Sequence, residues 1–188
     1  MKNIKTITFS CILAAFLASC TGKKEEDTTE IATHPQYKKE DFIAQIQTLQ
    51  SKISSEEKPD STTADEAVKA YADFAFNFPK DSLAPNYLFK AADMASLRGH
   101  YQQAIIYYQT IQDHYPNFKF VVESLYLQGY IYDNFINNDV KAKEIYEKVI
   151  VQYPHHKLAE DSRFAICNLG KSDEELIREF RKKKNYLP

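Results

Sequence analysis

The apolar positions of the chain repeat in three segments of similar pattern. The segments begin at Glu66, Gln103 and Lys141 and read EAVKAYADFAFNFPKDSL, QAIIYYQTIQDHYPNFKF and KAKEIYEKVIVQYPHHKL. In each, an alanine is followed after four residues by a tyrosine, after three more by an apolar residue and after five more by a proline. The aligned columns are Ala67, Ala104, Ala142; Tyr71, Tyr108, Tyr146; Phe74, Ile111, Val149; and Pro79, Pro116, Pro154. Steps of four and three place the first three columns on one face of a helix.

The region after each proline adds a second helix to the repeat. The thirteenth residue after each proline is small, and these residues are Ala92, Gly129 and Cys167. A small side chain there lets two helices approach closely, so Cys167 is predicted to be a buried small residue rather than a reactive thiol. Prolines spaced 37 and 38 residues apart indicate stacked repeats, because each unit leaves an apolar face that only its neighbour can cover.

The same periodicity and the turn residues predict an all-α chain. Thr63 with Glu66, and Ser172 with Glu175, have the spacing of capping boxes that open helices. Gly99 and the pair at 137–138 lie where helices must turn. Phe42, Ile46, Leu49 and Ile53 form one stripe on a preceding helix that is expected to cap the repeats. The predicted helices are 41–53, 64–78, 84–98, 101–115, 119–136, 139–153, 157–169 and 173–184.

The alanine, aromatic, apolar and proline spacing resembles the second helix of a tetratricopeptide repeat. The repeats are three or four residues longer than the usual 34 of that family, mostly just past the proline. The resemblance implies a tetratricopeptide-like α-solenoid of about three helix-pair repeats, with an N-terminal capping helix and a C-terminal helix.

Charge and composition exclude several other classes. A formal net charge of -2 offers no net field for nucleic acid. His155, His156, Glu160 and Asp161 resemble a set of metal ligands, but they occupy the repeated turn after the proline and the start of the next helix, so no metal site is expected. The chain contains no phosphate-binding glycine loop, G-x-S-x-G or HExxH motif. We therefore expect no enzymatic activity and no cofactor.

The first residues of the chain have the pattern of a targeting signal. Lys2 and Lys5 precede an apolar run, ITFSCILAAFLA, which is too short for a membrane span and is typical of a signal peptide. The run ends in LASC, residues 17–20, which resembles the lipobox of bacterial lipoproteins, whose cysteine is diacylated after the preceding segment is removed. The resemblance implies a signal peptide at residues 1–19 and a lipid on Cys20. The alternative is an ordinary secretory signal with a chance cysteine.

The rest of the chain is predicted to have three parts. Residues 20–40 have few apolar side chains and no periodicity, which is typical of a flexible tether. Residues 41–62 hold the short capping helix and a linker, and 63–188 form the repeat domain. The early KKEED resembles a charged signal that directs some lipoproteins to the outside of the outer membrane, so the expected location is the outer membrane, on its periplasmic face or at the cell surface.

The tetratricopeptide resemblance also implies a binding groove lined by the first helix of each repeat. The positions that match the family's groove are Phe89, Asp93, Tyr126, Tyr130, Asp133, Asn134, Phe164 and Asn168. Aromatic side chains flanked by acids suit an extended or helical partner with basic side chains. The aromatic column of Phe89, Tyr126 and Phe164 is equally consistent with a packed core.

Lipobox, tether and long repeats ending in Tyr-Pro together resemble the BamD family of outer-membrane assembly lipoproteins. That family has about five repeats, two more than this chain. The resemblance implies a lipid-anchored scaffold that binds envelope or outer-membrane proteins and is held at the membrane by its N-terminal lipid. The alternative is a surface lipoprotein that binds a small ligand or glycan in the repeat groove.

Overall fold

A computed structural model describes residues 38–55 and 60–184 of the chain. The predicted signal peptide, lipidated Cys20 and most of the tether lie outside the described residues. The described residues form eight α-helices, as predicted, and each bound agrees with the prediction within three residues. These helices are α1 (Lys39–Ser55), α2 (Ser61–Asn77), α3 (Ala84–Leu97), α4 (Tyr101–His114), α5 (Val121–Asn134), α6 (Asp139–Gln152), α7 (Lys157–Asn168) and α8 (Asp173–Lys184).

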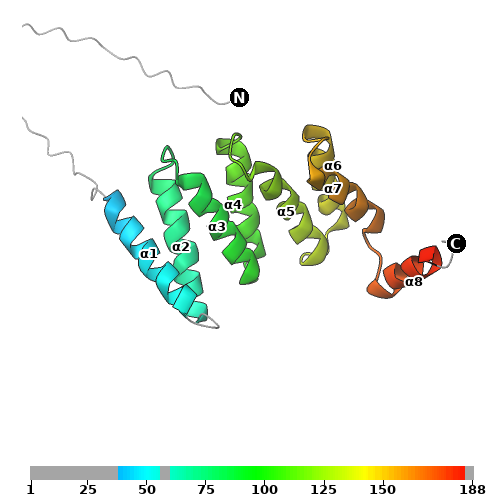
Figure 1. The fold of residues 1–188 in the computed structure, drawn as a ribbon, viewed down its shortest axis with the longest axis horizontal. Helices are drawn as coiled ribbons and strands as arrows, with labels where there is room; N and C mark the ends of the chain where they lie inside the picture. Colours follow the sequence, from blue (N-terminus) through cyan, green and yellow to red (C-terminus); the bar gives the residue numbers. More distant parts are fainter. Residues whose placement is uncertain (1–37, 56–59, 185–188) are drawn as a thin grey trace, which may run out of the picture. The chain divides into compact units, whose positions relative to one another are not determined.

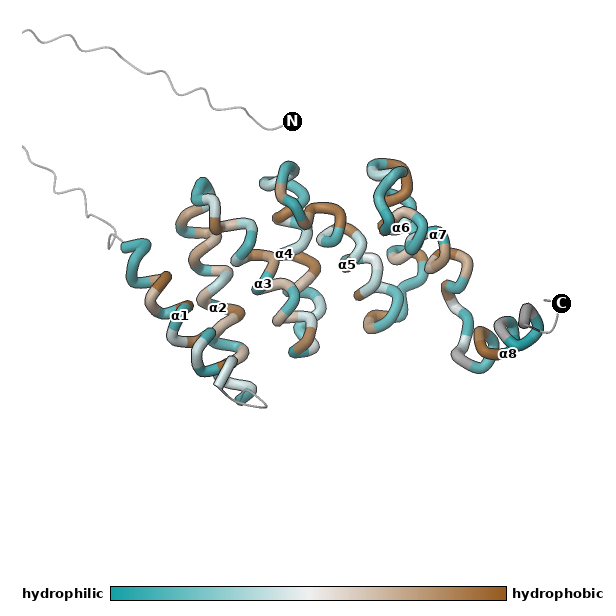
Figure 2. The backbone as a smooth tube through the Cα atoms, in the orientation of Figure 1, coloured by the Kyte–Doolittle hydropathy of each residue, from teal (hydrophilic) through white to brown (hydrophobic). Residues whose placement is uncertain are grey.

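The helices stack in chain order as an α-solenoid, which confirms the predicted fold class (Figure 1). Each helix from α1 to α6 packs against the next one in the chain. We call α3, α5 and α7 the first helices and α2, α4 and α6 the second helices of the repeats. Apolar and polar residues are interspersed along the helices (Figure 2), and buried apolar residues of α1 to α6 pack into clusters shared between neighbouring helices.

The repeated columns form the core of the stack. Every residue of the alanine, tyrosine and apolar columns is at most 4% exposed. Tyr108 and Tyr146 are the largest of the fully buried side chains. At the N-terminal end, Ile46 and Leu49 of α1 join the same core, and Phe42 contacts Phe78 edge to face at 5.6 Å. The prediction that α1 covers the first repeat is therefore confirmed by its packing.

The turns within helix pairs contain residues with left-handed backbone conformations. Gly99 has φ 80° between α3 and α4, and Asn137 has φ 55° between α5 and α6. Asn138 caps α6, because its side chain accepts a hydrogen bond from the backbone N–H of Lys141 at 3.0 Å. Both predicted turns are confirmed.

One of the two predicted capping boxes is wrong. The backbone N–H of Glu175 donates to Ser172 Oγ at 3.3 Å and the N–H of Ser172 donates to Glu175 Oε2 at 3.0 Å, so the second box opens α8 as expected. Helix α2 instead begins at Ser61 after Asp60, and no side chain caps it. Thr63 therefore lies inside the first turn and not at the N-cap position that a capping box requires.

Cys167 is exposed, which contradicts its predicted burial. Ala92 and Gly129 occupy the same column and are buried, because each faces a second helix. No second helix lies over α7 in the described part of the chain: α8 makes at most slight contact with the other helices. None of the described helices is long and apolar enough to cross a membrane.

Candidate functional site

The second-helix tyrosines hold two predicted groove acids in place. The hydroxyl of Tyr108 on α4 donates to Asp93 on α3, and that of Tyr146 on α6 donates to Asp133 on α5 at 3.3 Å. Burial raises the pKa of the Asp93 carboxyl, and the hydrogen bond from Tyr108 partly opposes this rise. Burial likewise raises the pKa of Asp133. The first helix of each central repeat therefore carries a carboxyl group that is hydrogen-bonded to a tyrosine of the paired second helix.

The predicted aromatic column divides between core and surface. Phe89 is half-buried and meets the ring of Tyr108 at 5.8 Å, and Tyr126 is half-buried and meets Tyr146 at 5.5 Å. Phe164 on α7 is instead 60% exposed. Within the central repeats these two aromatics therefore pack against the tyrosines of the second helices, whereas Phe164 is largely open to solvent.

Asp93 and Tyr130 line a common pocket between α3 and α5. The pocket has a volume of about 570 Å³. Its open rim includes Leu97, which is 88% exposed, and Tyr130, which is 40% exposed. Tyr101 and Phe135 line it as a stacked pair with ring centroids 4.6 Å apart. The result is a small aromatic hollow with one carboxyl group at its wall.

Two carboxyl groups, those of Asp133 and Asp161, lie beside Tyr126 on the neighbouring part of the same face. Burial raises the pKa of Tyr126, and the charges of Asp161, Tyr130 and Asp133 raise it further. The carboxylates of Asp133 and Asp161 therefore lie close enough to Tyr126 to disfavour ionisation of its hydroxyl. Carboxylates beside partly exposed aromatic rings favour a basic ligand group.

Two other predicted groove residues are bound to their own helix. The side-chain amide of Asn134 donates to the carbonyl of Tyr130 at 3.0 Å, and that of Asn168 donates to the carbonyl of Phe164 at 2.9 Å. Each amide retains its oxygen as an acceptor. Of the eight predicted groove residues the pocket contains only Asp93 and Tyr130, and it does not include Phe89, Tyr126, Asp133, Asn134, Phe164 or Asn168.

Four residues of this face were missed by the sequence analysis. Leu97 occupies the column of Asn134, eighteen residues after the preceding proline, so extending that column to α3 would have found it. Tyr101 and Phe135 lie at helix ends, and their stacking across two repeats has no signal in either segment alone. Asp161 was interpreted only as an acid at a helix start, although it also neighbours Tyr126.

A larger hollow of about 840 Å³ lies between the second helices α4 and α6. On its α6 side Glu144 pairs with Lys141 at 2.8 Å and with Lys148 at 3.1 Å. With Asp113, which also lines the hollow, two carboxylates balance two lysines, and the lining mixes polar and apolar side chains without a dominant chemistry. Its size alone does not make it the better candidate.

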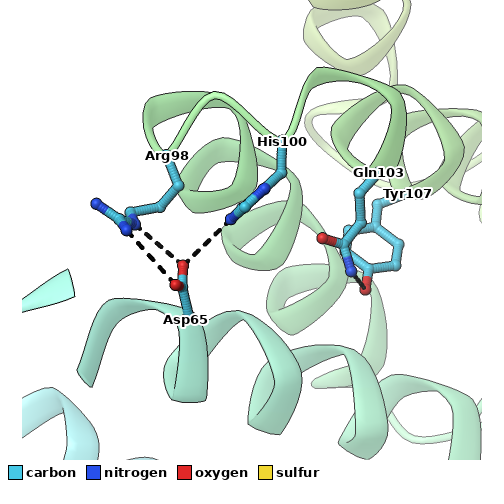
Figure 3. Close-up of polar contacts among 5 residues, drawn as sticks. All are labelled: Asp65, Arg98, His100, Gln103 and Tyr107. Atoms are coloured by element: carbon cyan, nitrogen blue, oxygen red, sulfur yellow. Dashed lines mark hydrogen bonds and ion pairs between the residues drawn. The ribbon is translucent and has the colours of Figure 1, made fainter. Parts of the chain in front are cut away.

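A polar cluster between α2 and the α3–α4 turn was also missed (Figure 3). Arg98 Nε donates to Asp65 Oδ1 at 3.0 Å, and His100 Nε2 lies 3.3 Å from the same oxygen. Arg98 lowers the pKa of Asp65 through its hydrogen bond and its charge. The side chains of Gln103 and Tyr107 pair separately at 2.7 Å. The cluster joins α2 to the turn between α3 and α4. None of the residues labelled in Figure 3 places a serine, threonine or cysteine beside His100.

The paired histidines lie in the predicted turn. His156 caps α7, because its Nδ1 accepts a hydrogen bond from the backbone N–H of Leu158 at 3.3 Å. Within the described residues, no group of three or more His, Cys, Asp or Glu side chains is arranged to hold a metal ion. His156 thus has a structural role at a helix start.

Comparison with known proteins supports the repeat assignment. The family model of the tetratricopeptide repeat matches residues 87–117 and 123–156. The first match covers most of α3 and all of α4, and the second most of α5 and all of α6. The family is typically a protein-interaction scaffold without catalytic activity. A search of curated proteins found no match.

Proposed function

We propose that this tetratricopeptide-repeat protein is a lipid-anchored scaffold of the cell envelope that binds a partner protein through the groove of its first helices. The observation that supports the groove is the pocket between the two matched repeats, where Asp93 and Tyr130 meet the stacked rings of Tyr101 and Phe135. Exposed aromatic and aliphatic side chains around a small hollow are the usual anchors of protein interfaces.

The chemistry of the groove suggests the kind of partner. An apolar side chain of the partner would fill the hollow beside Leu97 and Tyr130. Basic side chains would lie over Tyr126, where Asp133 and Asp161 supply negative charge. The partner is therefore an extended or helical segment with an apolar anchor and flanking lysines or arginines.

Binding should depend on the groove rim and not on the opposite surface. In the full-length protein, Leu97→Asp places a charge at the rim of the hollow, and Val151→Asp makes the same kind of change on α6, where Val151 is 77% exposed. We expect cross-linking and affinity purification from native envelopes to recover a specific partner with wild type and Val151→Asp. Leu97→Asp and Tyr130→Ala should lose it. Equal recovery with all four proteins would contradict the groove.

The lipid anchor is proposed from the lipobox residues that end in Cys20. Two or three acyl chains hold a protein durably at a bilayer. Wild type should fractionate with outer membranes, and Cys20→Ser should lose this association. A Cys20→Ser variant that stays with the membrane would contradict the anchor while leaving the groove untouched. Assembly of outer-membrane proteins is the role that the BamD resemblance favours.

Binding of a glycan or small ligand in the same hollow is the alternative. A thermal-shift screen of the full-length protein separates the two, because a ligand stabilises the folded state in proportion to its occupancy. Stabilisation by sugars and none by basic peptides would replace the scaffold proposal.

A further inference from the structure

The hollow between α4 and α6 has one face of α5 as its floor. The floor residues are Val121, Leu125, Gln128 and Tyr132, whose spacing of four, three and four residues places them on one side of the helix. Its walls are α4 and α6, which make at most slight contact with each other. Between the first and the last floor residue the helix rises about 16 Å. The hollow is therefore elongated along the axis of α5.

Gln128 is the one polar residue of its repeat column. The twelfth residue after each repeat proline is Ala91, Gln128 or Ile166. Gln128 is 2% exposed, and its Nε2 donates to the carbonyl of Ser124 at the long distance of 3.4 Å. Within the part of the chain that the structure describes, no donor bonds its Oε1. A buried amide with incomplete hydrogen bonding is destabilising, so packing alone favours an apolar residue in this column.

The corresponding gap between α2 and α4 is nearly closed. Ala91 of α3, in the column of Gln128, is 0% exposed. Above it Phe76 of α2 and Tyr107 of α4 bring their rings within 6.1 Å. The hollow that remains there has a volume of about 160 Å³, against about 840 Å³ between α4 and α6, and its lining residues come from α2, α4 and the turn before α4. The buried amide thus coincides with the wide gap between second helices.

The hydrogen-bonding groups of Gln128 match those of a polypeptide backbone. A side-chain amide has two donor hydrogens and an acceptor oxygen. With one hydrogen directed at Ser124, Gln128 can offer its Oε1 and its second hydrogen to a ligand. One residue of an extended segment presents its N–H and C=O on the same side, whereas a helix uses these groups internally. About five residues of extended chain also span the length of the floor.

The charges of the hollow are divided between its two walls. On α6, Lys141 and Lys148 share the carboxylate of Glu144, at 2.8 and 3.1 Å. On α4, the carboxylate of Asp113 accepts a hydrogen bond from Gln109 at 2.8 Å. The lining of the α6 wall therefore has one more cation than anions, and that of the α4 wall has one anion. A complementary ligand has an acidic group on its α6 side and a basic group on its α4 side.

We propose that the α4–α6 hollow binds an extended segment of a partner protein, with the backbone of one residue hydrogen-bonded to Gln128. An acidic side chain of the segment lies towards the lysines of α6 and a basic one towards Asp113. The hollow shares no lining residue with the pocket of Asp93 and Tyr130. This second site is therefore independent of the groove proposed above, and a protein with both sites can hold two partners at once.

The probe for this site is a phage-displayed library of random peptides, selected on immobilised full-length protein. Selected peptides are synthesised, and their Kd is measured by fluorescence polarisation. We expect Gln128→Leu to weaken binding at least about tenfold, since it removes the hydrogen bonds to the peptide backbone. Because this column otherwise holds apolar residues, Gln128→Leu should melt at a temperature at least as high as wild type. Lys148→Glu should weaken the binding of peptides that carry an acidic residue.

Gln102→Leu provides the matched control, because Gln102 is exposed on α4 outside the lining of the hollow. Its peptide binding should equal that of wild type. If Gln128→Leu melts below wild type, Gln128→Ala takes its place, since Ala91 already occupies this column in α3.

Three results overturn the proposal. The first is that selection yields no binding peptide. The second is that every selected peptide binds Gln128→Leu as tightly as wild type; peptides lost with Leu97→Asp alone would then report the groove of the first helices. The third is self-association of wild type that Gln128→Leu abolishes, because the occupant would then be a second copy of the chain.

Discussion

The two central repeats and the α7 segment carry the same aligned columns but differ in what those columns contact. Ala92 and Gly129 are buried, whereas Cys167 at the same place is exposed. Phe89 and Tyr126 are half-buried, whereas Phe164 is 60% exposed. The difference lies in the neighbouring helix, because α4 and α6 cover α3 and α5 while α8 stands apart from α7. In a repeat protein, the residue types therefore indicate which face of a helix can pack against a neighbour. Whether that face is buried depends on a neighbouring helix being present.

The strongest test of this difference removes a central aromatic. Tyr146 is fully buried against Gly129 and Tyr126. We expect Tyr146→Ala to lower the free energy of unfolding by about 3–5 kcal/mol, the usual cost of truncating a buried aromatic side chain. Ile177→Ala in α8 should change it by less than about 0.5 kcal/mol, because Ile177 is 50% exposed. Urea denaturation followed by circular dichroism measures both, and equal losses would contradict the comparison.

The next test concerns Asp93, the carboxyl group that lines the groove pocket. Asp93 accepts the hydroxyl of Tyr108, which is 1% exposed. Asp93→Ala leaves this buried hydroxyl without its acceptor and should cost about 1–3 kcal/mol. Asn168 has the same column on α7 but donates only to its own helix, so Asn168→Ala should cost less than about 0.5 kcal/mol. A loss at Asn168 as large as at Asp93 would indicate that α7 has an equally ordered partner.

The pH dependence of the same site separates charge from hydrogen bonding. Because burial raises the Asp93 pKa in the folded state above its ordinary value of 3.8, the folded state binds the proton more tightly than the unfolded state. This stabilising contribution is complete below pH 3.8 and is lost as pH rises through the raised pKa. Asp93→Asn keeps an acceptor without the charge, so its stability relative to wild type should increase over that interval. A difference that does not change with pH would contradict the buried charge.

A smaller effect is expected where two helices approach most closely. Gly129→Ala gains helix propensity of about 1 kcal/mol but places a Cβ against the buried Tyr146 ring, and overpacking of this kind costs about 1–3 kcal/mol. The expected net loss is about 1 kcal/mol in chemical denaturation. Cys167→Ala should stay within about 0.5 kcal/mol of wild type, because Ala already occupies this column at Ala92. A stabilised Gly129→Ala would show that the Tyr146 ring can move aside.

The sequence predicted the elements better than the contacts between them. The Tyr71, Tyr108 and Tyr146 columns predicted helix faces because periodicity is a local property. The pairing of Tyr101 with Phe135, and of Asp65 with Arg98, joins residues more than thirty positions apart, and neither segment signals the other. The groove positions were predicted from the family resemblance. How far their aromatic side chains are buried depends on the paired helices, and the sequence alone does not place those helices. Cys167 was misplaced because its column was assumed to have the same neighbour in every repeat.

The weakest expected effect compares two surface ion pairs, one in each region. Arg98 bonds Asp65 across 33 residues, and Lys171 lies 2.9 Å from Glu179 across only eight, with all four side chains 31–49% exposed. Exposed pairs of this kind contribute little and are screened by salt. Because Arg98 lowers the Asp65 pKa, the contribution of the first pair is present above the ordinary pKa of 3.8 and is lost as pH falls through the lowered value. In thermal melts at low salt and neutral pH, Arg98→Ala should lower the melting temperature slightly and Lys171→Ala should lower it less, because only the Arg98 pair joins two packed repeats. Added salt should abolish both shifts. A larger shift for Lys171→Ala would mean that the α7–α8 connection contributes more to the stability of the fold than the slight contact between α8 and the other helices implies.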